Sequence, residues 1–229
     1  MSSLDGPVIV TGAASGLGAA VAQAVGKAGG TPVCFDLRPP DEDTEHEVVD
    51  LADGRATEGA VERVAERHGG LAAVVTAAGT DACGRLEDVP AKRWEQVIKV
   101  NLLGTVSVVR AALPHLADSR GKVVVVGSTL GLRAVSDATA YCASKFGVVG
   151  FARALAAETA GRVGVSLLIP GGMQTAFFDA REERYKPPPE LKLNRPEDVA
   201  EAVIFALQQP PGCEVREMVV CPSSETSWP

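Results

Sequence analysis

Short apolar segments alternate with longer segments of helical periodicity along the whole chain. The apolar segments are bounded by turn residues and predict strands at 7–11, 31–36, 47–50, 71–76, 122–127, 164–169 and 215–221. The intervening patterns predict helices near 15–29, 54–68, 91–117, 139–160 and 196–208. Runs such as KVVVVGS lack polar alternation, which indicates strands buried on both faces. The pattern predicts an α/β fold: one doubly wound domain over 1–229, with about seven parallel strands and helices on both faces.

Prolines refine the helix boundaries. Pro90 and Pro196 stand at the start of helical patterns, where a first-turn proline is favoured. Pro114 falls inside the pattern over 91–117 and is expected to kink or end that helix.

A glycine-rich turn joins the first predicted strand to the first helix. Gly12, Gly16 and Gly18 have the spacing GxxxGxG, which is wider than GxGxxG and also suits a turn kept only for tight packing. Such a turn lets the backbone approach a pyrophosphate, and the following helix offers free N–H groups and the positive end of its dipole. The turn therefore predicts a nucleotide site.

An acidic residue ends the second predicted strand. Asp36 follows Gly18 by 18 residues, where a carboxylate accepts hydrogen bonds from the ribose hydroxyls of adenosine. The same charge repels a 2′-phosphate by roughly 4 kcal/mol at about 4 Å and an effective dielectric near 20. Leu37 and Ser15 supply no basic partner for such a phosphate, although Arg38 is close in sequence. These residues favour NAD over NADP.

The segment YCASK contains a tyrosine and a lysine one helical turn apart. Tyr141 and Lys145 share a helix face, and Ser128 precedes the tyrosine by 13 residues. A phenol has an ordinary pKa of about 10, so a fixed positive charge beside it would bring it closer to the range of a general base. A surface tyrosine and a solvated lysine would give the same spacing, so this pair needs support from the rest of the chain.

Taken in order, these segments resemble the short-chain dehydrogenase/reductase family over nearly the whole chain, which implies a Rossmann-type domain. The resemblance assigns Asp50 and Leu51 to the adenine ring, and the segment from Pro170 to Thr175 to the nicotinamide. The full set of cofactor-binding residues that it implies is Gly12, Ser15, Gly16, Leu17, Gly18, Asp36, Asp50, Leu51, Ala78, Gly79, Tyr141, Lys145, Pro170, Gly171, Met173 and Thr175. One departure is Ala77, which stands where the family usually has an asparagine that ties neighbouring strands together.

The resemblance also implies a mechanism, with Asn101, Ser128, Tyr141 and Lys145 as catalytic residues. Hydride would pass between NAD(H) and a secondary alcohol or ketone, with Tyr141 as general base or acid. Lys145 would lower the pKa of the phenol and bind the nicotinamide ribose. Ser128 would hold the substrate oxygen, and Asn101 would fix a water that carries the proton outward.

Composition and charge limit the partners and the location. A net charge of −7 argues against nucleic acid or an anionic membrane as partner and leaves a small-molecule substrate. Five scattered cysteines without a CxxC motif indicate reduced thiols, and the three histidines lack ligand spacing, so no metal site is predicted. The polar N-terminus and the absence of 18 consecutive apolar residues predict a soluble, cytoplasmic protein.

The irregular segment from about 176 to 194 matches the place of the family's substrate lid. Arg181, Arg184 and Lys186 could bind a carboxylate or phosphate of the substrate, or could belong to a mixed-charge surface together with neighbouring acids. The sequence leaves the substrate open.

Two other functions and one assembly follow from the resemblance. The chain is also similar to 3-oxoacyl-acyl-carrier-protein reductases, which usually use NADPH, so Asp36 counts against that function. A regulator that senses NAD without turnover tends to lose the tyrosine or the lysine, and both are kept here. The family commonly forms tetramers through its long helices. The second of these helices carries several apolar residues: Phe146, Val148, Val149, Phe151 and Leu155. A homotetramer is therefore predicted, with a dimer as the alternative.

Overall fold

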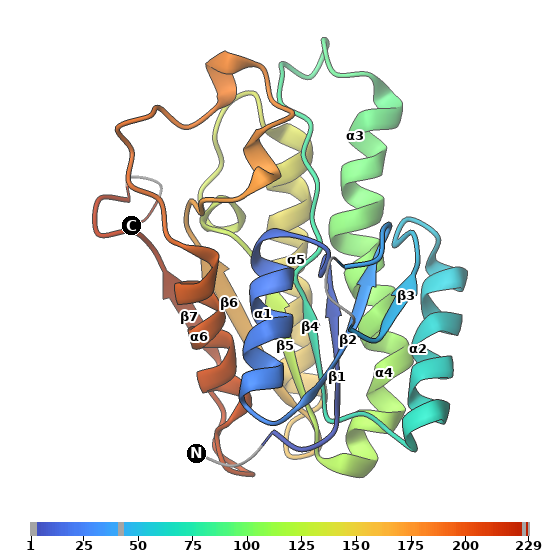
Figure 1. Cartoon of the computed structure of the whole chain (residues 1–229). Coiled ribbons are helices and arrows are strands. Elements are labelled where there is room, and N and C mark those ends of the chain that lie inside the picture. The colour runs from blue at the N-terminus through green and yellow to red at the C-terminus, as the bar shows by residue number, and fades with distance from the viewer. Residues whose placement is uncertain (1–3, 41–43, 226–227, 229) are drawn as a thin grey trace.

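Seven parallel strands form one sheet in a computed structural model that describes residues 4–40, 44–225 and 228 (Figure 1). The strand order is β3-β2-β1-β4-β5-β6-β7, so the direction of winding reverses next to β1. The strands are β1 (Pro7–Thr11), β2 (Thr31–Asp36), β3 (His46–Val48), β4 (Ala73–Thr76), β5 (Lys122–Val126), β6 (Gly164–Pro170) and β7 (Glu217–Val220). The predicted range of 1–229 includes residues 1–3, 41–43, 226–227 and 229, which lie outside the described residues.

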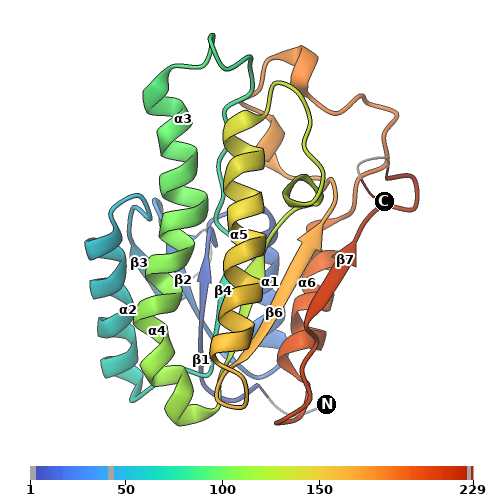
Figure 2. The same cartoon turned by 180° about the vertical axis from the view of Figure 1, so that it is seen from behind.

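Helices cover both faces of the sheet. The α-helices are α1 (Gly16–Lys27), α2 (Gly54–His68), α3 (Ala91–Ile98), α4 (Thr105–Ser119), α5 (Thr139–Glu158) and α6 (Pro196–Leu207). Helices α1 and α6 lie on one face, and α2, α4 and α5 lie on the other (Figures 1 and 2). The predicted doubly wound α/β fold is confirmed.

Alternate residues of each central strand enter two different cores. In β1, Val8 and Val10 join the core under α1 and α6, whereas Ile9 joins the core under α2, α4 and α5. All three side chains are fully buried, which explains why the strand has no polar alternation. Burial of one such side chain contributes about 1.5–3 kcal/mol to stability.

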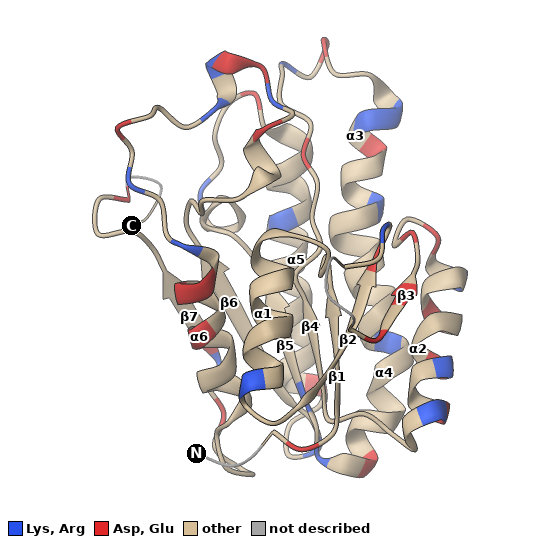
Figure 3. Cartoon of the chain, viewed as in Figure 1, with Lys and Arg blue, Asp and Glu red and all other residues tan. Residues whose placement is uncertain are grey.

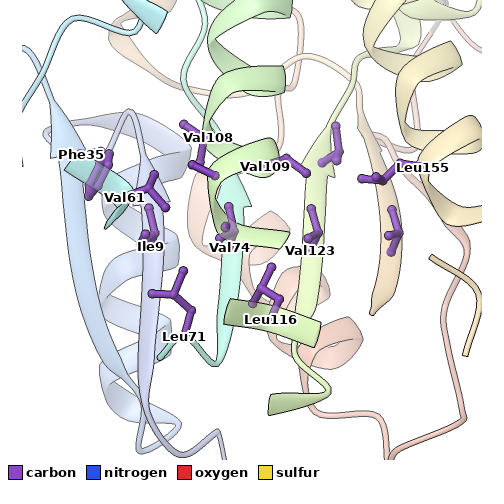
Figure 4. Close-up of a cluster of buried hydrophobic side chains, with 14 of the residues drawn as sticks. Ile9, Phe35, Val61, Leu71, Val74, Val108, Val109, Leu116, Val123 and Leu155 are labelled. Carbon is purple, nitrogen blue, oxygen red and sulfur yellow. The ribbon is translucent and has the colours of Figure 1, made fainter. Parts of the chain in front are cut away.

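The larger core joins the sheet to the long helices. Figure 4 shows Val74 and Val123, from neighbouring strands, beside Val108 and Leu116 of α4. All four are fully buried. This packing fixes the carboxyl ends of the strands relative to the helices that carry several site residues.

The long helical pattern over 91–117 differs in detail from its prediction. Between α3 and α4 the helix widens into a π-helical segment, η1 (Lys99–Gly104), that contains Asn101. Pro114 does not end the helix, which continues to Ser119. The proline lacks an N–H for the ladder and its ring crowds the carbonyl four residues earlier, but the fully buried Leu116 packs the last turn onto the sheet. The helix ends at Arg120, which has a left-handed φ of 53°.

The continuous helix from Ala91 to Ser119 is long and apolar enough to cross a membrane by length and composition, and half of its most apolar window is buried inside the fold. Core helices with one face on a sheet pass the same test. Charged residues gather on the outer faces of the helices and on the loops above the strands, whereas the strands carry few (Figure 3).

Candidate active site

A cleft of about 780 Å³ lies at the carboxyl ends of the strands. This is the edge where ligands bind in doubly wound sheets, next to the point where the strand order reverses. All the residues that we predicted to bind the cofactor line this cleft, as does Ser128. The remaining predicted catalytic residue, Asn101, is fully buried and is absent from the lining.

The glycine-rich turn brings the backbone to the floor of the cleft. Gly12 has a left-handed φ of 69°, and a Cβ there would lie 2.8 Å from the Cα of Ala78. A Cβ on Gly18 would lie 2.2 Å from the carbonyl oxygen of Gly12. Both positions therefore require glycine, and helix α1 begins directly behind the turn at Gly16. The geometry suits a bound pyrophosphate, because the glycines of the turn line the cleft without side chains and the first turn of α1 follows directly.

Asp36 stands at the end of β2 and organises the same turn. Its Oδ2 accepts a hydrogen bond from the Ala14 amide at 3.0 Å, and its Oδ1 accepts one from the Leu37 amide at 2.7 Å. A longer bond of 3.4 Å comes from the Arg38 amide. These bonds fix the carboxylate at the cleft wall, where it suits a ribose.

Residues after β3 form the neighbouring wall. Leu51 is buried, and a Cβ on Gly104 of the π-helical segment would lie 2.8 Å from the Leu51 Cβ. Asp50 accepts a hydrogen bond from the Ala52 amide at 2.9 Å. This small apolar wall suits an adenine ring.

Asn101 links three segments in the interior. Its Oδ1 accepts a hydrogen bond from the Thr80 amide at 2.8 Å, and its Nδ2 donates to the Thr80 carbonyl at 2.9 Å. Nδ2 also donates to the Ser144 hydroxyl at 3.0 Å, and that hydroxyl donates to the Tyr141 carbonyl at 2.8 Å. The π-helical turn places this amide where it holds the helix of Tyr141 to the segment after β4.

Ser128, Tyr141 and Lys145 meet at one end of the cleft. The Ser128 hydroxyl and the Tyr141 phenol form a hydrogen bond. Lys145 is 5% exposed as a residue, and its ammonium donates to the Val126 carbonyl at 2.9 Å and lies 5.8 Å from the centroid of the Tyr141 ring. The helical spacing of YCASK thus places the ammonium near the Tyr141 ring, whose hydroxyl contacts the serine. The catalytic roles of these residues stay predictions.

Burial dominates the ionisation of Tyr141 and Lys145. Burial raises the pKa of Tyr141 to about 12, which the hydrogen bond with Ser128 only partly offsets. Burial also lowers the pKa of Lys145 to about 8. For Tyr141, the loss of solvent outweighs the Ser128 hydrogen bond and the nearby charge of Arg181. The lowering of the phenol pKa by Lys145 stays a prediction.

The segment after β6 forms the opposite wall. Thr175 lies close to the first turn of α1, since a Cβ on Gly16 would lie 3.3 Å from its Cγ2. Met173 pairs with Asn194 in an isolated bridge, and the Gln174 amide donates to the Asn194 carbonyl at 2.8 Å. The last residue of the predicted lid is thus held to the segment that precedes the lid.

The lid, 176–194, packs over the catalytic end through side chains. The Phe177 ring lies 5.7 Å from the Tyr141 ring, centroid to centroid. The Arg181 guanidinium lies over the rings of Phe177 and Phe178 at 5.2 and 4.6 Å from their centroids, and it pairs with Asp81 at 2.5 Å. This ion pair is mostly buried, with side-chain exposures of 18% and 8%. It joins the lid to the loop after β4.

Several residues that line the cleft were not predicted to be functional. The aromatic pair Phe177 and Phe178 could have been found as two adjacent rings within a polar lid. Thr80 and Leu193 have no distinguishing sequence signal, and neither does Glu225, which follows the last strand.

Comparison with known proteins agrees with this geometry. The family profile described as short chain dehydrogenase matches residues 7–186. The chain is 30% identical over 222 residues to the 3-oxoacyl-acyl-carrier-protein reductase FabG of Thermotoga maritima, covering 88% of this chain and 90% of that protein. It is 29% identical to L-fucose dehydrogenase of Mus musculus, covering 96% and 89%.

A solved structure shares the fold. The alcohol dehydrogenase from Thermococcus sibiricus, complexed with 5-hydroxy-NADP, superposes with a TM-score of 0.85 at 24% identity, covering 96% of this chain and 98% of that one. The profile match extends from β1 through the tyrosine–lysine helix into the lid. This chain belongs to the short-chain dehydrogenase family and is an oxidoreductase.

Proposed function

We propose that this protein transfers a hydride between NAD(H) and an uncharged secondary alcohol or ketone. The observation that carries the proposal is the position of Ser128, Tyr141 and Lys145 at one end of a cleft whose other end holds Asp36. Bound NAD supplies the hydride acceptor, and the protein supplies geometry and charge.

Each of the four catalytic residues has a separate role in binding the substrate or moving its proton. The Ser128 hydroxyl donates a hydrogen bond to the substrate oxygen and so orients that oxygen toward the phenol. Tyr141 Oη takes the alcohol proton in oxidation and returns it in reduction. Because burial raises the pKa of Tyr141 to about 12, proton removal from the phenol depends on positive charge beside it. Lys145 supplies part of that charge, and Asn101 holds the backbone of the tyrosine helix through Ser144.

NAD is the proposed cofactor because of the carboxylate of Asp36. A 2′-phosphate at the ribose would meet a negative charge already fixed by main-chain amides. Arg38 is exposed and close, but the contact of its amide with the same carboxylate orders the backbone rather than the guanidinium. The NADP-type ligand of the Thermococcus sibiricus enzyme shows that this fold also accepts the phosphate, so the preference must be measured on this chain.

An uncharged substrate is proposed because the lid cations already have anionic partners. Arg181 pairs with Asp81, Arg184 with Glu182 at 2.9 Å and Lys186 with Glu183 at 3.1 Å. A substrate carboxylate would compete with these partners, most severely at the buried pair. Within the described residues, Arg181 Nε is buried and has no hydrogen-bond partner, which leaves one donor for a neutral oxygen.

Reduction of 3-oxoacyl thioesters is the second candidate, favoured by the 30% identity to the Thermotoga maritima reductase. The decisive experiment measures binding of NAD+, NADH, NADP+ and NADPH, followed by turnover of secondary alcohols, sugars, ketones and an acetoacetyl thioester. NAD-linked turnover of a neutral alcohol supports the proposal. Turnover only of the thioester with NADPH supports the alternative, and tight NAD binding without any turnover would indicate a sensor.

We further propose a cytoplasmic homotetramer that acts on small molecules and has no nucleic-acid or membrane partner. Of the apolar residues predicted on the tyrosine helix, Val148, Val149 and Leu155 are buried on their own sheet, and Phe146 is 45% exposed. The apolar surface of this helix is therefore smaller than predicted. Leu103, beside it on the neighbouring helix, and Phe205 and Val219, at the last helix and strand, extend the exposed apolar surface. Light scattering tests the assembly, and a monomer near 23.7 kDa would contradict it.

A further inference from the structure

The chain segment after the last strand turns back onto the cleft. Strand β7 ends at Val220, and the Glu225 amide donates to the Pro222 carbonyl at 2.9 Å, which closes a turn. This turn carries the carboxylate of Glu225 to the wall formed by Gly171 and Gly172, directly after β6. The Glu225 side chain lines the same cleft as Tyr141 and Thr175.

The carboxylate occupies space that a side chain on Gly171 would need. Glu225 Oε2 accepts a hydrogen bond from the Gly172 amide at 3.0 Å. A Cβ on Gly171 would lie 2.4 Å from the same oxygen, and a Cβ on Gly172 would lie 2.7 Å from Leu193 Cδ2. The two glycines therefore accommodate the C-terminal turn on one side and the lid on the other. A half-buried carboxylate is thereby fixed at this wall.

We propose that Glu225 is a cofactor-binding residue that favours the oxidised, cationic nicotinamide over the reduced one. The inference rests on the proposed function, in which the wall from Pro170 to Thr175 faces the nicotinamide. NAD+ and NADH differ by one positive charge, and that charge lies on the nicotinamide ring. A fixed negative charge nearby therefore stabilises NAD+ relative to NADH.

The charge of Glu225 gives the cleft a preference for one redox form of the cofactor. The lid cations at this end have anionic partners, since Arg181 pairs with Asp81, Arg184 with Glu182 and Lys186 with Glu183. The Lys145 ammonium donates to the neutral Val126 carbonyl. Glu225 would tighten the binding of NAD+ relative to that of NADH, so NAD+ would occupy the cleft preferentially when both forms are present. At a partly exposed site, one unit charge changes the ratio of the two affinities by about threefold to tenfold.

The experiment compares dissociation constants for NAD+ and NADH in the wild type, Glu225→Gln and Glu201→Gln. Glutamine keeps an oxygen for the Gly172 amide and removes only the charge. Glu201 lies on the exposed side of α6 and controls for net charge. We expect Kd(NADH)/Kd(NAD+) to fall at least about threefold in Glu225→Gln and to stay unchanged in Glu201→Gln.

The outcomes separate the two proposals. If the wild type binds both cofactors and the ratio in Glu225→Gln equals that of the control, the role of Glu225 is overturned while the proposed function stands. If the wild type binds neither cofactor, the proposed function is overturned and this inference with it. Should Glu225→Gln fail to fold, Glu225→Ala is measured in its place, and an unchanged ratio has the same meaning.

Discussion

The two ends of the cleft are built from different kinds of contact. At the nucleotide end, main-chain amides take part in the contacts that hold the site: Gly12 donates to Phe35, Ala14 to Asp36 and Ala78 to the Thr11 hydroxyl. At the substrate end, side chains meet side chains across long sequence separations, as in the Asp81–Arg181 pair and the hydrogen bond from Tyr185 to Asp137.

This difference explains what each end can do. Backbone contacts at glycine positions tolerate almost no substitution, so the shape of the nucleotide end is fixed by the main chain. Side-chain contacts can be exchanged pair by pair without disturbing the sheet. The catalytic residues lie between these ends, on a helix that Asn101 and Ser144 tie to the segment after β4. Four predictions test the comparison.

The largest expected effect comes from the phenol that joins the two ends. Tyr141→Phe removes the titrating oxygen and keeps the ring that packs on Phe177, so NAD binding should persist while kcat falls at least about a hundredfold. The matched control is Tyr185→Phe, which removes a lid hydroxyl bonded to Asp137. Steady-state kinetics and cofactor titration measure both, and retention of more than a few per cent of activity by Tyr141→Phe would contradict the assignment.

The second effect is on stability. Burial lowers the pKa of Lys145 to about 8 from an ordinary 10.5, so below pH 8 the folded state bears the full desolvation of the ammonium. Replacement by methionine should raise the free energy of unfolding at pH 7 by about 1–3 kcal/mol, after allowance for the lost bond to Val126. The unfolded chain binds the extra proton between pH 8 and 10.5, so this gain should shrink through that window.

Urea unfolding at pH 7 and at pH 9.5 measures the change. Equal gains at both values would mean that packing, and not the ammonium charge, sets the difference. Catalytic activity should be lost in the same variant, which would show that the site keeps a buried charge at the expense of stability.

Most of the fold and the nucleotide end could be predicted from the sequence, for a physical reason. Strands buried on both faces leave uninterrupted apolar runs, and close backbone approach at Gly12 and Gly18 demands glycine. The π-helical turn at Asn101 could not be predicted, because its pattern looks like ordinary helix. The same holds for Asp81–Arg181 and for Glu225, whose partners are set by tertiary packing and not by spacing.

A third, smaller effect concerns the choice between NAD and NADP at Asp36. We expect the wild type to favour NAD over NADP by at least about tenfold in kcat/KM, because the 2′-phosphate would meet the charge of Asp36. Asp36→Ala should lower the ratio of kcat/KM with NAD to kcat/KM with NADP. Asp36→Asn keeps an oxygen for the Ala14 amide and so separates the charge from its role in the turn. Kinetics with both cofactors checks this, and equal use of NAD and NADP by the wild type would overturn the cofactor assignment.

The smallest effect tests whether the substrate end can be changed without disturbing the nucleotide end. Asp81→Asn removes the carboxylate that neutralises Arg181 and keeps an amide oxygen for the Ala82 amide. The guanidinium then becomes available to a substrate anion, because its buried partner no longer carries charge. The ratio of kcat/KM for a carboxylate-bearing alcohol to that for its neutral amide should rise about threefold, as expected for one partly screened unit charge.

The affinity for NAD+ should not change, because Asp81 is not among the residues that line the cleft. Glu182→Gln, which frees the more exposed Arg184, is the matched control and should shift the ratio less. If Asp81→Asn weakened NAD+ binding as much as it altered substrate choice, the two ends of the cleft would be coupled, and the contrast between them would not hold.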